Sequence, residues 1–289
     1  MRAAIFGVAL ASLALVLAAT ATGTPAGPAQ SGNCAKANLD LVKDGRLTLG
    51  TDNPAFPPWW GGAPKSPWQV SNPASGKGYE SAVAYAVAKQ LGFGRGQVNW
   101  IHVKFAQSYR PGKKPFDWYM AQVSYTPARD GAVDFSNAYY FVNQALVARE
   151  GTAIARARTR ADLRPYRLGA QLGTTSYQFI TDQIRPDSRP LAYPSNDLAV
   201  QALKNGQIDG IVVDLPTAFY VTAVQVEDGV IVGQFPSRGK RERFGMVFET
   251  GSTLKRCVNR VLNTLWSNGT MAKIKTRWLS QAAGAPVIR

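Results

Sequence analysis

The segment at residues 116–136, FDWYMAQVSYTPARDGAVDFS, brings a hydroxyl group, free backbone amides and a guanidinium to one predicted strand-to-helix junction. An apolar run of strand length turns polar by Ser124, and Thr126 is a good N-cap with Pro127 at the first helical position. Arg129 then falls in the first turn, where a cation is unfavourable because the exposed N–H groups already carry partial positive charge. Together these groups form a site that lacks an anion, and a ligand carboxylate would complete it. A surface arginine at a turn is the alternative interpretation.

Two further junctions place polar groups at the ends of predicted strands. Thr174 and Thr175 follow the strand at 168–171, in a tight turn whose amides and hydroxyls suit a carboxylate. Simple helix capping is the alternative for both threonines. Asp214 ends the buried-strand run at 208–213, and the carboxyl ends of such strands are where open α/β sheets bind ligands. Asp214 could instead cap the helix that follows it.

The elements that position these junctions alternate between strand and helix along the chain. The apolar run at 47–50 predicts a strand, the periodicity of 80–91 predicts a helix that stops at Gly92, and the same order recurs after residue 168. This order predicts an α/β protein with two lobes, each a mostly parallel sheet flanked by helices.

The loop at 53–62, NPAFPPWWGG, is rigid and aromatic. Its prolines fix the backbone, and its rings suit the wall of a pocket better than a packed core. Packing of the rings against the rest of the protein is the alternative, and we expect at least one ring to do only that. Phe56, Trp59 and Trp60 are the candidates for the pocket wall.

The composition argues against several classes of function. The formal net charge is +15, but the basic residues are spread singly or in loose runs, without a zinc-ligand cluster or an aromatic RNA-binding motif. We therefore expect no nucleic-acid partner. His102 is the single histidine and lies in a predicted strand, and no Ser-His-Asp set, metal-ligand cluster or glycine-rich nucleotide loop is present in the sequence. We predict no enzyme activity, no metal and no cofactor.

The N-terminal residues have the features of an export signal. A short basic start precedes an apolar stretch at 5–17 that is too short to span a bilayer comfortably, and ATA at 19–21 is a small-x-small cleavage site. We predict a signal peptide and linker over residues 1–33, with cleavage at about 21–29. The mature protein would be exported, to the periplasm or the extracellular space.

The chain contains two cysteines, Cys34 and Cys257. In an exported protein this number favours one disulfide bond. Cys257 lies on the apolar side of a strongly periodic helix, so a buried free thiol is the alternative.

Several motifs, in order along the chain, resemble those of the extracellular solute-binding proteins of ABC importers, specifically the polar amino acid family. The resemblance covers nearly all of the chain from Leu47 to Trp278 and implies a type II periplasmic-binding-protein fold. The motifs are the strand ending in Thr51-Asp52, GYESAVAYAVAKQLGF, SYTPARDGAVDFSNAYY, LGTTS, ALKNGQIDGIVVD and NGTMAKIKTRWL.

The resemblance implies roles for individual residues. In that family the motif arginine, here Arg129, clamps the α-carboxylate of the ligand, and Ser124 and Gln122 are similar to positions whose hydroxyl and backbone carbonyl receive the α-ammonium. Asp214 matches the aspartate that pairs with the same ammonium. The other implied ligand-binding positions are the second carboxylate grip, Thr174 and Thr175, the pocket-floor acid Asp52, and the aromatic pair Phe56 and Phe105, with Trp59 as a further candidate.

The resemblance also implies where the lobes lie. Lobe one is expected over residues 38–141 plus 241–289 and lobe two over 145–238, joined by two hinge crossings near 141–144 and 237–244. A disulfide between the two cysteines would then lie inside lobe one. Two departures from the family pattern are a loop at 55–78 that is longer and richer in Pro and Trp, and a glutamine at 122 where small residues are common.

We expect from these features a monomeric protein that binds a free, polar amino acid and delivers it to an ABC permease in the membrane. One alternative is an enzyme on the same scaffold, such as a cyclohexadienyl dehydratase that uses an acid such as Glu80. Another is an orphan binding protein or sensor without a permease.

Overall fold

The computed structural model describes Met1 and residues 34–237, 239, 241–279 and 285–289. The predicted signal peptide and linker from residue 2 to 33 lie outside these described residues. Residues 34–289 form one compact unit. Within the described part of the chain, no helix is long and apolar enough to cross a membrane.

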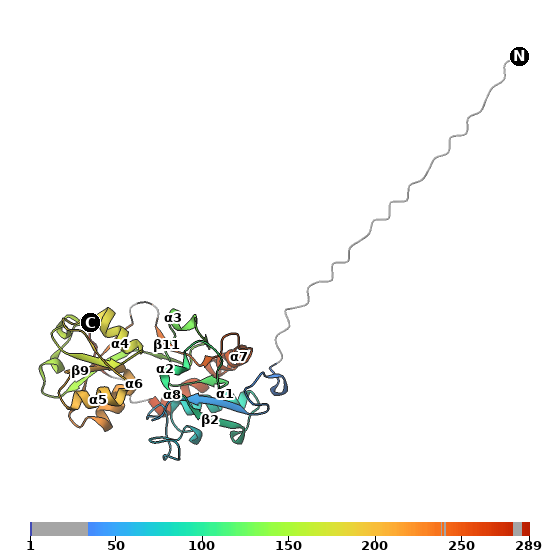
Figure 1. Cartoon of the computed structure of the whole chain (residues 1–289), viewed down its shortest axis with the longest axis horizontal. Coiled ribbons are helices and arrows are strands. Elements are labelled where there is room, and N and C mark those ends of the chain that lie inside the picture. Colours follow the sequence, from blue (N-terminus) through green and yellow to red (C-terminus); the bar gives the residue numbers. More distant parts are fainter. Residues whose placement is uncertain (2–33, 238, 240, 280–284) are drawn as a thin grey trace. The chain divides into compact units, whose positions relative to one another are not determined.

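The first sheet, which defines lobe one, has the strand order β2-β1-β3-β12-β4. Its edge strand β2 is labelled in Figure 1. Its central strand β1 is buried along its whole length and pairs in parallel with β2 and β3, whereas β12 is antiparallel to β3 and β4. Four strands therefore share one direction. The strands are β1 (Leu47–Thr51), β2 (Val98–His102), β3 (Trp118–Tyr119), β4 (Asp134–Phe135) and β12 (Val247–Phe248).

The second sheet, which defines lobe two, has the order β10-β6-β9-β7-β8. Strand β7 pairs in parallel with β8 and β9, and β6 is antiparallel to both β9 and β10, so four of these strands also share one direction. The strands are β6 (Gln144–Arg149), β7 (Leu168–Gln171), β8 (Leu191–Tyr193), β9 (Gly210–Asp214) and β10 (Gly229–Phe235).

The chain passes from the first sheet to the second through β5 (Tyr140–Val142) and returns through β11 (Glu242–Phe244). These two strands pair with each other as an antiparallel ribbon, with Glu242 opposite Val142. The α/β fold with two mostly parallel sheets confirms the fold class predicted from the sequence.

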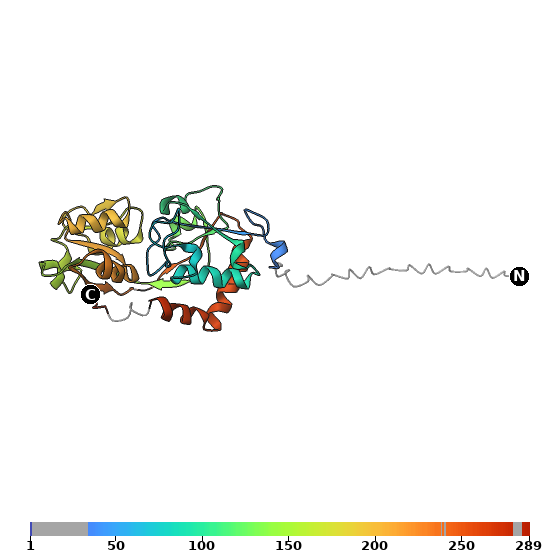
Figure 2. The same cartoon turned by 90° about the horizontal axis from the view of Figure 1, so that it is seen from below.

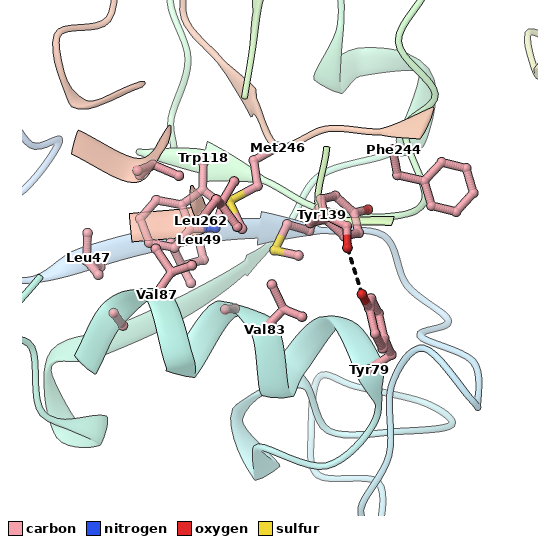
Figure 3. Close-up of a cluster of buried hydrophobic side chains, with 14 of the residues drawn as sticks. Leu47, Leu49, Tyr79, Val83, Val87, Trp118, Tyr139, Phe244, Met246 and Leu262 are labelled. Carbon is pink, nitrogen blue, oxygen red and sulfur yellow. Dashed lines mark hydrogen bonds between the residues drawn. The ribbon is translucent and has the colours of Figure 1, made fainter. Parts of the chain in front are cut away.

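Helix α1 (Tyr79–Gln90) covers the lobe-one sheet with the face that carries Val83 and Val87 (Figure 3). The Tyr79 hydroxyl at its first turn donates a hydrogen bond of 2.6 Å to the backbone carbonyl of Tyr139. Helices α7 (Leu254–Ser267) and α8 (Thr270–Leu279) contact α1, and α7 buries a stripe at helical spacing. The buried stripe consists of Leu254, Cys257, Val258, Leu262 and Leu265.

The remaining helices are short. Helices α4 and α6 each continue into a π-helical turn, at residues 180–184 and 221–225. The short helices are α2 (Phe105–Ser108), α3 (Pro127–Asp130), α4 (Thr175–Phe179), α5 (Asn196–Lys204) and α6 (Leu215–Tyr220).

The C-terminal residues 285–289 contact lobe two, although the resemblance assigned them to lobe one. Gln234 of β10 bridges to Val287, and Ile288 is buried among lobe-two side chains. Figure 2 shows the C terminus in the half that contains this sheet, while α7 and α8 lie in the other half. The end of the chain therefore packs on lobe two after α8 has packed on lobe one.

The disulfide predicted from the sequence is present between Cys34 and Cys257, with the Cα atoms 5.6 Å apart. Both cysteines pack in the lobe-one core. The bond ties the start of the described chain to α7.

Candidate functional site

The Arg129 side chain lies at the junction of the two lobes. Thr126 caps α3 by accepting the backbone N–H of Arg129 at 3.2 Å, with Pro127 in the first turn. This local geometry, expected from the sequence, directs the guanidinium to two backbone carbonyls: Nη1 donates to Ser124 at 2.6 Å and Nη2 to Gly173 of lobe two at 2.7 Å. The guanidinium therefore connects the β3–α3 segment to the turn before α4.

Arg129 is buried, with 8% of its surface exposed. Its guanidinium lies 4.5 Å from the ring centre of Tyr109 and 5.6 Å from that of Phe105. Burial lowers the pKa of Arg129 from its usual value. Among the described residues no carboxylate lies within ion-pair distance of it. A buried cation without an ion pair is costly, and a bound anion would remove that cost.

Two hydroxyls from opposite lobes meet beside Arg129. The Oγ of Ser124 lies 3.2 Å from the Oγ1 of Thr175, the first residue of α4. Both hydroxyls donate to the same oxygen, Oε1 of Glu242, at 2.6 and 2.5 Å. The pair is thus arranged to hold a carboxylate, and here the carboxylate belongs to the hinge strand β11.

Gln144 connects this carboxylate to Asp214. Its Nε2 donates to Oε2 of Glu242 at 2.9 Å and to Oδ1 of Asp214 at 3.3 Å, while its Oε1 accepts from Ser176 at 2.7 Å. Asp214 is the last residue of β9, opposite Gln144 on β6. Desolvation, and next the neighbouring Glu242 carboxylate, raise the pKa of Asp214 well above its usual value. A ligand cation beside Asp214 would favour the ionised carboxylate and so oppose this rise in its pKa.

Gln122 lies two residues before Ser124, in a left-handed conformation with φ 52°. Its backbone N–H donates to Oε1 of Glu80 at 2.8 Å, its Nε2 donates to Oε2, and the Tyr139 hydroxyl donates to Oε1. Glu80 is fully buried, and this desolvation raises its pKa to about 7 against the opposing hydrogen bonds. Glu80 therefore holds the backbone at Gln122 in place. Gln122 and Tyr139 in turn donate hydrogen bonds to the Glu80 carboxylate oxygens.

Glu80→Gln is expected to remove a pH-dependent part of the stability. The folded state binds a proton that the unfolded state releases, so the contribution of Glu80 is full below about pH 4.5 and is lost as the pH rises through about 7. Between pH 5 and pH 8 the free energy of unfolding of the wild type should fall by about 2 to 3 kcal/mol relative to that of the variant. Denaturant unfolding at both pH values measures this, with the exposed Glu227→Gln as control. Equal pH dependence in wild type and Glu80→Gln would contradict the assignment.

Asp52 is anchored on the lobe-one side of the site. Its carboxylate accepts the backbone N–H groups of Asn53 at 2.9 Å and Phe105 at 3.2 Å, and His102 Nε2 lies 3.4 Å from Oδ1. Asp52 is partly exposed and follows β1, so a carboxylate remains available at this end of the sheet.

The aromatic loop contributes mainly to packing. Trp59 is buried with 1% of its surface exposed, packs edge-on against Tyr79, Tyr140 and Phe244, and donates from Nε1 to Thr217 of lobe two at 3.1 Å. It therefore lies in the hydrophobic core of lobe one, with its indole N–H reaching lobe two, as the packing interpretation allowed. Phe56 is only partly buried, and its ring centre lies 5.8 Å from that of Tyr220 in lobe two.

The two threonines of the turn before α4 differ in role. Thr174 is the N-cap: its Oγ1 donates to the carbonyl of Gln171 at 2.7 Å and accepts the N–H of Tyr177 at 3.2 Å. Its hydroxyl is thereby used in capping, which was the alternative interpretation from the sequence. The Thr175 hydroxyl is the one that reaches lobe one.

An apolar cavity of about 300 Å³ lies away from these groups. It is formed between the prolines that precede Trp59, helix α6 and the end of α8, with Arg277 as its one cationic side chain. None of the polar groups that surround Arg129 or Asp214 lines it. Within the described residues, no group of three or more His, Cys, Asp or Glu side chains could hold a metal ion.

Comparison with known proteins decides the family. Residues 61–281 match the family described as bacterial extracellular solute-binding proteins, family 3. The chain belongs to this family.

Three proteins named for amino acid binding are similar to this chain over most of their own length. The ABC transporter arginine-binding protein 1 of Escherichia coli K12 is 27% identical over 211 residues, which cover 71% of this chain and 82% of that protein. A solved structure of an ancestral arginine-binding protein bound to glutamine is 26% identical, has a TM-score of 0.66, and is matched over 82% of this chain and 99% of its own. The ancestral amino acid-binding protein AncCDT-1, a precursor of cyclohexadienyl dehydratase, is also 26% identical, with a TM-score of 0.65 and coverage of 81% and 95%.

Within this solute-binding protein, the structure gathers four of the predicted residues, Ser124, Arg129, Thr175 and Asp214, around one point between the lobes. Three contributors were missed as site residues by sequence reasoning: Gln144, Glu242 and the buried Glu80, which was considered only as an enzyme acid. Gln144 begins β6, the strand that follows the hinge ribbon, and Glu242 begins β11, one of the two strands of that ribbon. A polar residue at a hinge crossing is the signal that would have found them.

Proposed function

We propose that this solute-binding protein binds the zwitterion of a free, polar amino acid between its lobes. The buried guanidinium of Arg129, without an ion pair in the described structure and next to the Ser124 and Thr175 hydroxyls, is the observation that carries the proposal. A ligand α-carboxylate at this position receives a charge-assisted fork of hydrogen bonds and relieves the burial of the cation.

The α-ammonium of the ligand is proposed to lie beside Asp214. This carboxylate ends β9 of lobe two, so a zwitterion that reaches both Asp214 and Arg129 contacts both lobes at once. Because the two ends of the ligand bind different lobes, the ligand favours the closed arrangement over the open one, as a population shift requires. The lobe boundaries proposed from the sequence place the hinge at the β5–β11 ribbon.

We propose a cationic or amide side chain for the ligand. Asp52 lies at the lobe-one end of the site with its carboxylate partly exposed, and lobe one supplies two rings, Phe105 beside Arg129 and Phe56 beside Tyr220 of lobe two. The relatives named above support this choice, since one is named for arginine and the ancestral protein was solved with glutamine. Arginine and glutamine are therefore the first ligands to test.

The closed form would deliver its ligand to an ABC permease. This step, the export of the chain by its predicted signal peptide and its monomeric state are proposals supported by membership of the extracellular solute-binding family. Genes for a permease and an ATPase next to the gene for this protein would favour delivery over an orphan binding or sensing role.

The dehydratase alternative is not favoured. The acid considered for it, Glu80, is fully buried and accepts hydrogen bonds from Gln122 and Tyr139, so its oxygens are occupied within the protein. Incubation with prephenate or arogenate is expected to give no product, and product formation would revive this alternative.

A thermal-shift screen tests the proposal. The protein is unfolded, dialysed and refolded to remove any bound amino acid, and its Tm is measured with each of the twenty amino acids. L-arginine or L-glutamine at about 1,000 times its Kd is expected to stabilise the fold by about 4 kcal/mol, which raises the Tm by roughly 10 °C. Agmatine, which is arginine without its α-carboxylate, is the matched control and should give almost no shift. No shift with any amino acid would contradict the proposal.

A further inference from the structure

The carboxylate of Glu242 connects the two lobes through a chain of hydrogen bonds. Its Oε1 accepts from Ser124 of lobe one and from Thr175 of lobe two, and its Oε2 accepts from Gln144 of lobe two. Glu242 itself lies on β11, which pairs with β5 in the ribbon that links the two lobes. One side chain thus makes the kind of two-lobed contact that a ligand makes.

An amino acid cannot use the same hydroxyls while Glu242 holds them. The Ser124 and Thr175 oxygens are 3.2 Å apart, which is direct contact, and both protons are directed to the same Glu242 oxygen. A ligand carboxylate that accepts from Thr175 must take that proton from Glu242. A ligand placed between the hydroxyls must also separate them.

The surroundings of the Glu242 carboxylate are electrostatically unfavourable. Gln144 Nε2 is shared between the carboxyl groups of Glu242 and Asp214, so two acidic groups lie around one donor, and no cation of the described residues pairs with either of them. Glu242 leaves the Arg129 guanidinium without an ion pair. A zwitterion supplies an anion for Arg129 and a cation for Asp214, and can therefore displace Glu242.

We propose that Glu242 is an internal competitor: its carboxylate occupies the hydroxyl pair of the ligand site, holds the lobes together when no amino acid is bound, and must be displaced by the ligand. This inference rests on the proposed function, because it assumes that the amino acid uses the same site. Glu242 is then a determinant of affinity, because only the molecules whose Glu242 carboxylate has left the hydroxyl pair can bind the amino acid.

The test uses Glu242→Gln and Glu242→Ala, with the exposed Glu227→Gln as a control for net charge. All proteins are refolded from denaturant to remove bound amino acid. Small-angle scattering without ligand is expected to show both Glu242 variants more open than the wild type and the control. Calorimetric titration with L-arginine and L-glutamine is expected to show binding on the order of tenfold tighter in both Glu242 variants.

The outcomes separate the two proposals. Equal compactness of wild type and variants without ligand, or weaker amino acid binding by the variants, would overturn the competitor role; weaker binding would mean that Glu242 joins Asp214 in holding the ligand ammonium. If neither wild type nor variants bind any amino acid, the proposed function fails, and the scattering still decides whether Glu242 holds the lobes together.

Discussion

Arg129→Ala is expected to abolish measurable amino acid binding at micromolar protein concentrations. The substitution removes the cation that we propose for the ligand carboxylate and leaves Asp214 facing an ammonium in an unbalanced site. Truncation of one partner in a buried charge pair costs about 3 kcal/mol or more, which corresponds to at least a 100-fold loss of affinity. Titration calorimetry with the amino acid selected by the thermal-shift screen measures this loss of affinity.

Two matched variants control this experiment. Arg129→Lys keeps the charge but loses the planar fork that reaches Ser124 and Gly173, so an intermediate loss is expected. Arg110→Ala removes an exposed arginine of the same lobe and should leave the affinity unchanged. Undiminished binding by folded Arg129→Ala would show that the ligand carboxylate is held elsewhere.

Removal of the disulfide is expected to have the largest effect on stability. The bond joins Cys34 to Cys257 across 223 residues, and the chain-entropy model gives about 5 kcal/mol for a loop of this length. The double variant Cys34→Ser, Cys257→Ser should therefore unfold at a Tm lower by on the order of 10 °C. Differential scanning calorimetry measures the shift.

The Tm and the amino acid affinity of the reduced wild type show whether the disulfide affects stability without affecting binding. Reduction of the wild type should reproduce the Tm of the double variant, and amino acid affinity should be unchanged, because both cysteines pack in the lobe-one core and the bond does not join the two lobes. A reduced wild type with the Tm of the oxidised protein would contradict the stabilising role.

The sequence predicted the local part of the site because its signals are local. Thr126, Pro127 and Arg129 lie in one turn, and their capping and dipole chemistry can be read from adjacent residues. The α/β order and the disulfide likewise follow from periodicity and from the cysteine count in a chain predicted to be exported, and both are confirmed. The resemblance added the expected boundaries of the two lobes. The contact of Arg129 with Gly173 of lobe two joins distant segments, and no local pattern contains it.

The parts that the sequence did not predict depend on contacts between distant segments. Glu242 reaches Ser124 across 118 positions and Gln144 reaches Asp214 across 70, so neither pair leaves a signal in spacing. Trp59 looked like a pocket wall because its loop is rich in proline, yet three rings from other segments surround it. The C-terminal residues 285–289 carry no pattern that indicates which lobe they contact.

The central claim is that Arg129 of lobe one and Asp214 of lobe two bind the two ends of one zwitterion. A crystal structure of the protein with the amino acid selected by the thermal-shift screen tests this most directly. We predict the α-carboxylate on the Arg129 guanidinium, the α-ammonium on Asp214, and the Glu242 carboxylate released from the Ser124 and Thr175 hydroxyls. An amino acid bound away from Arg129, with Glu242 still on both hydroxyls, would contradict the account.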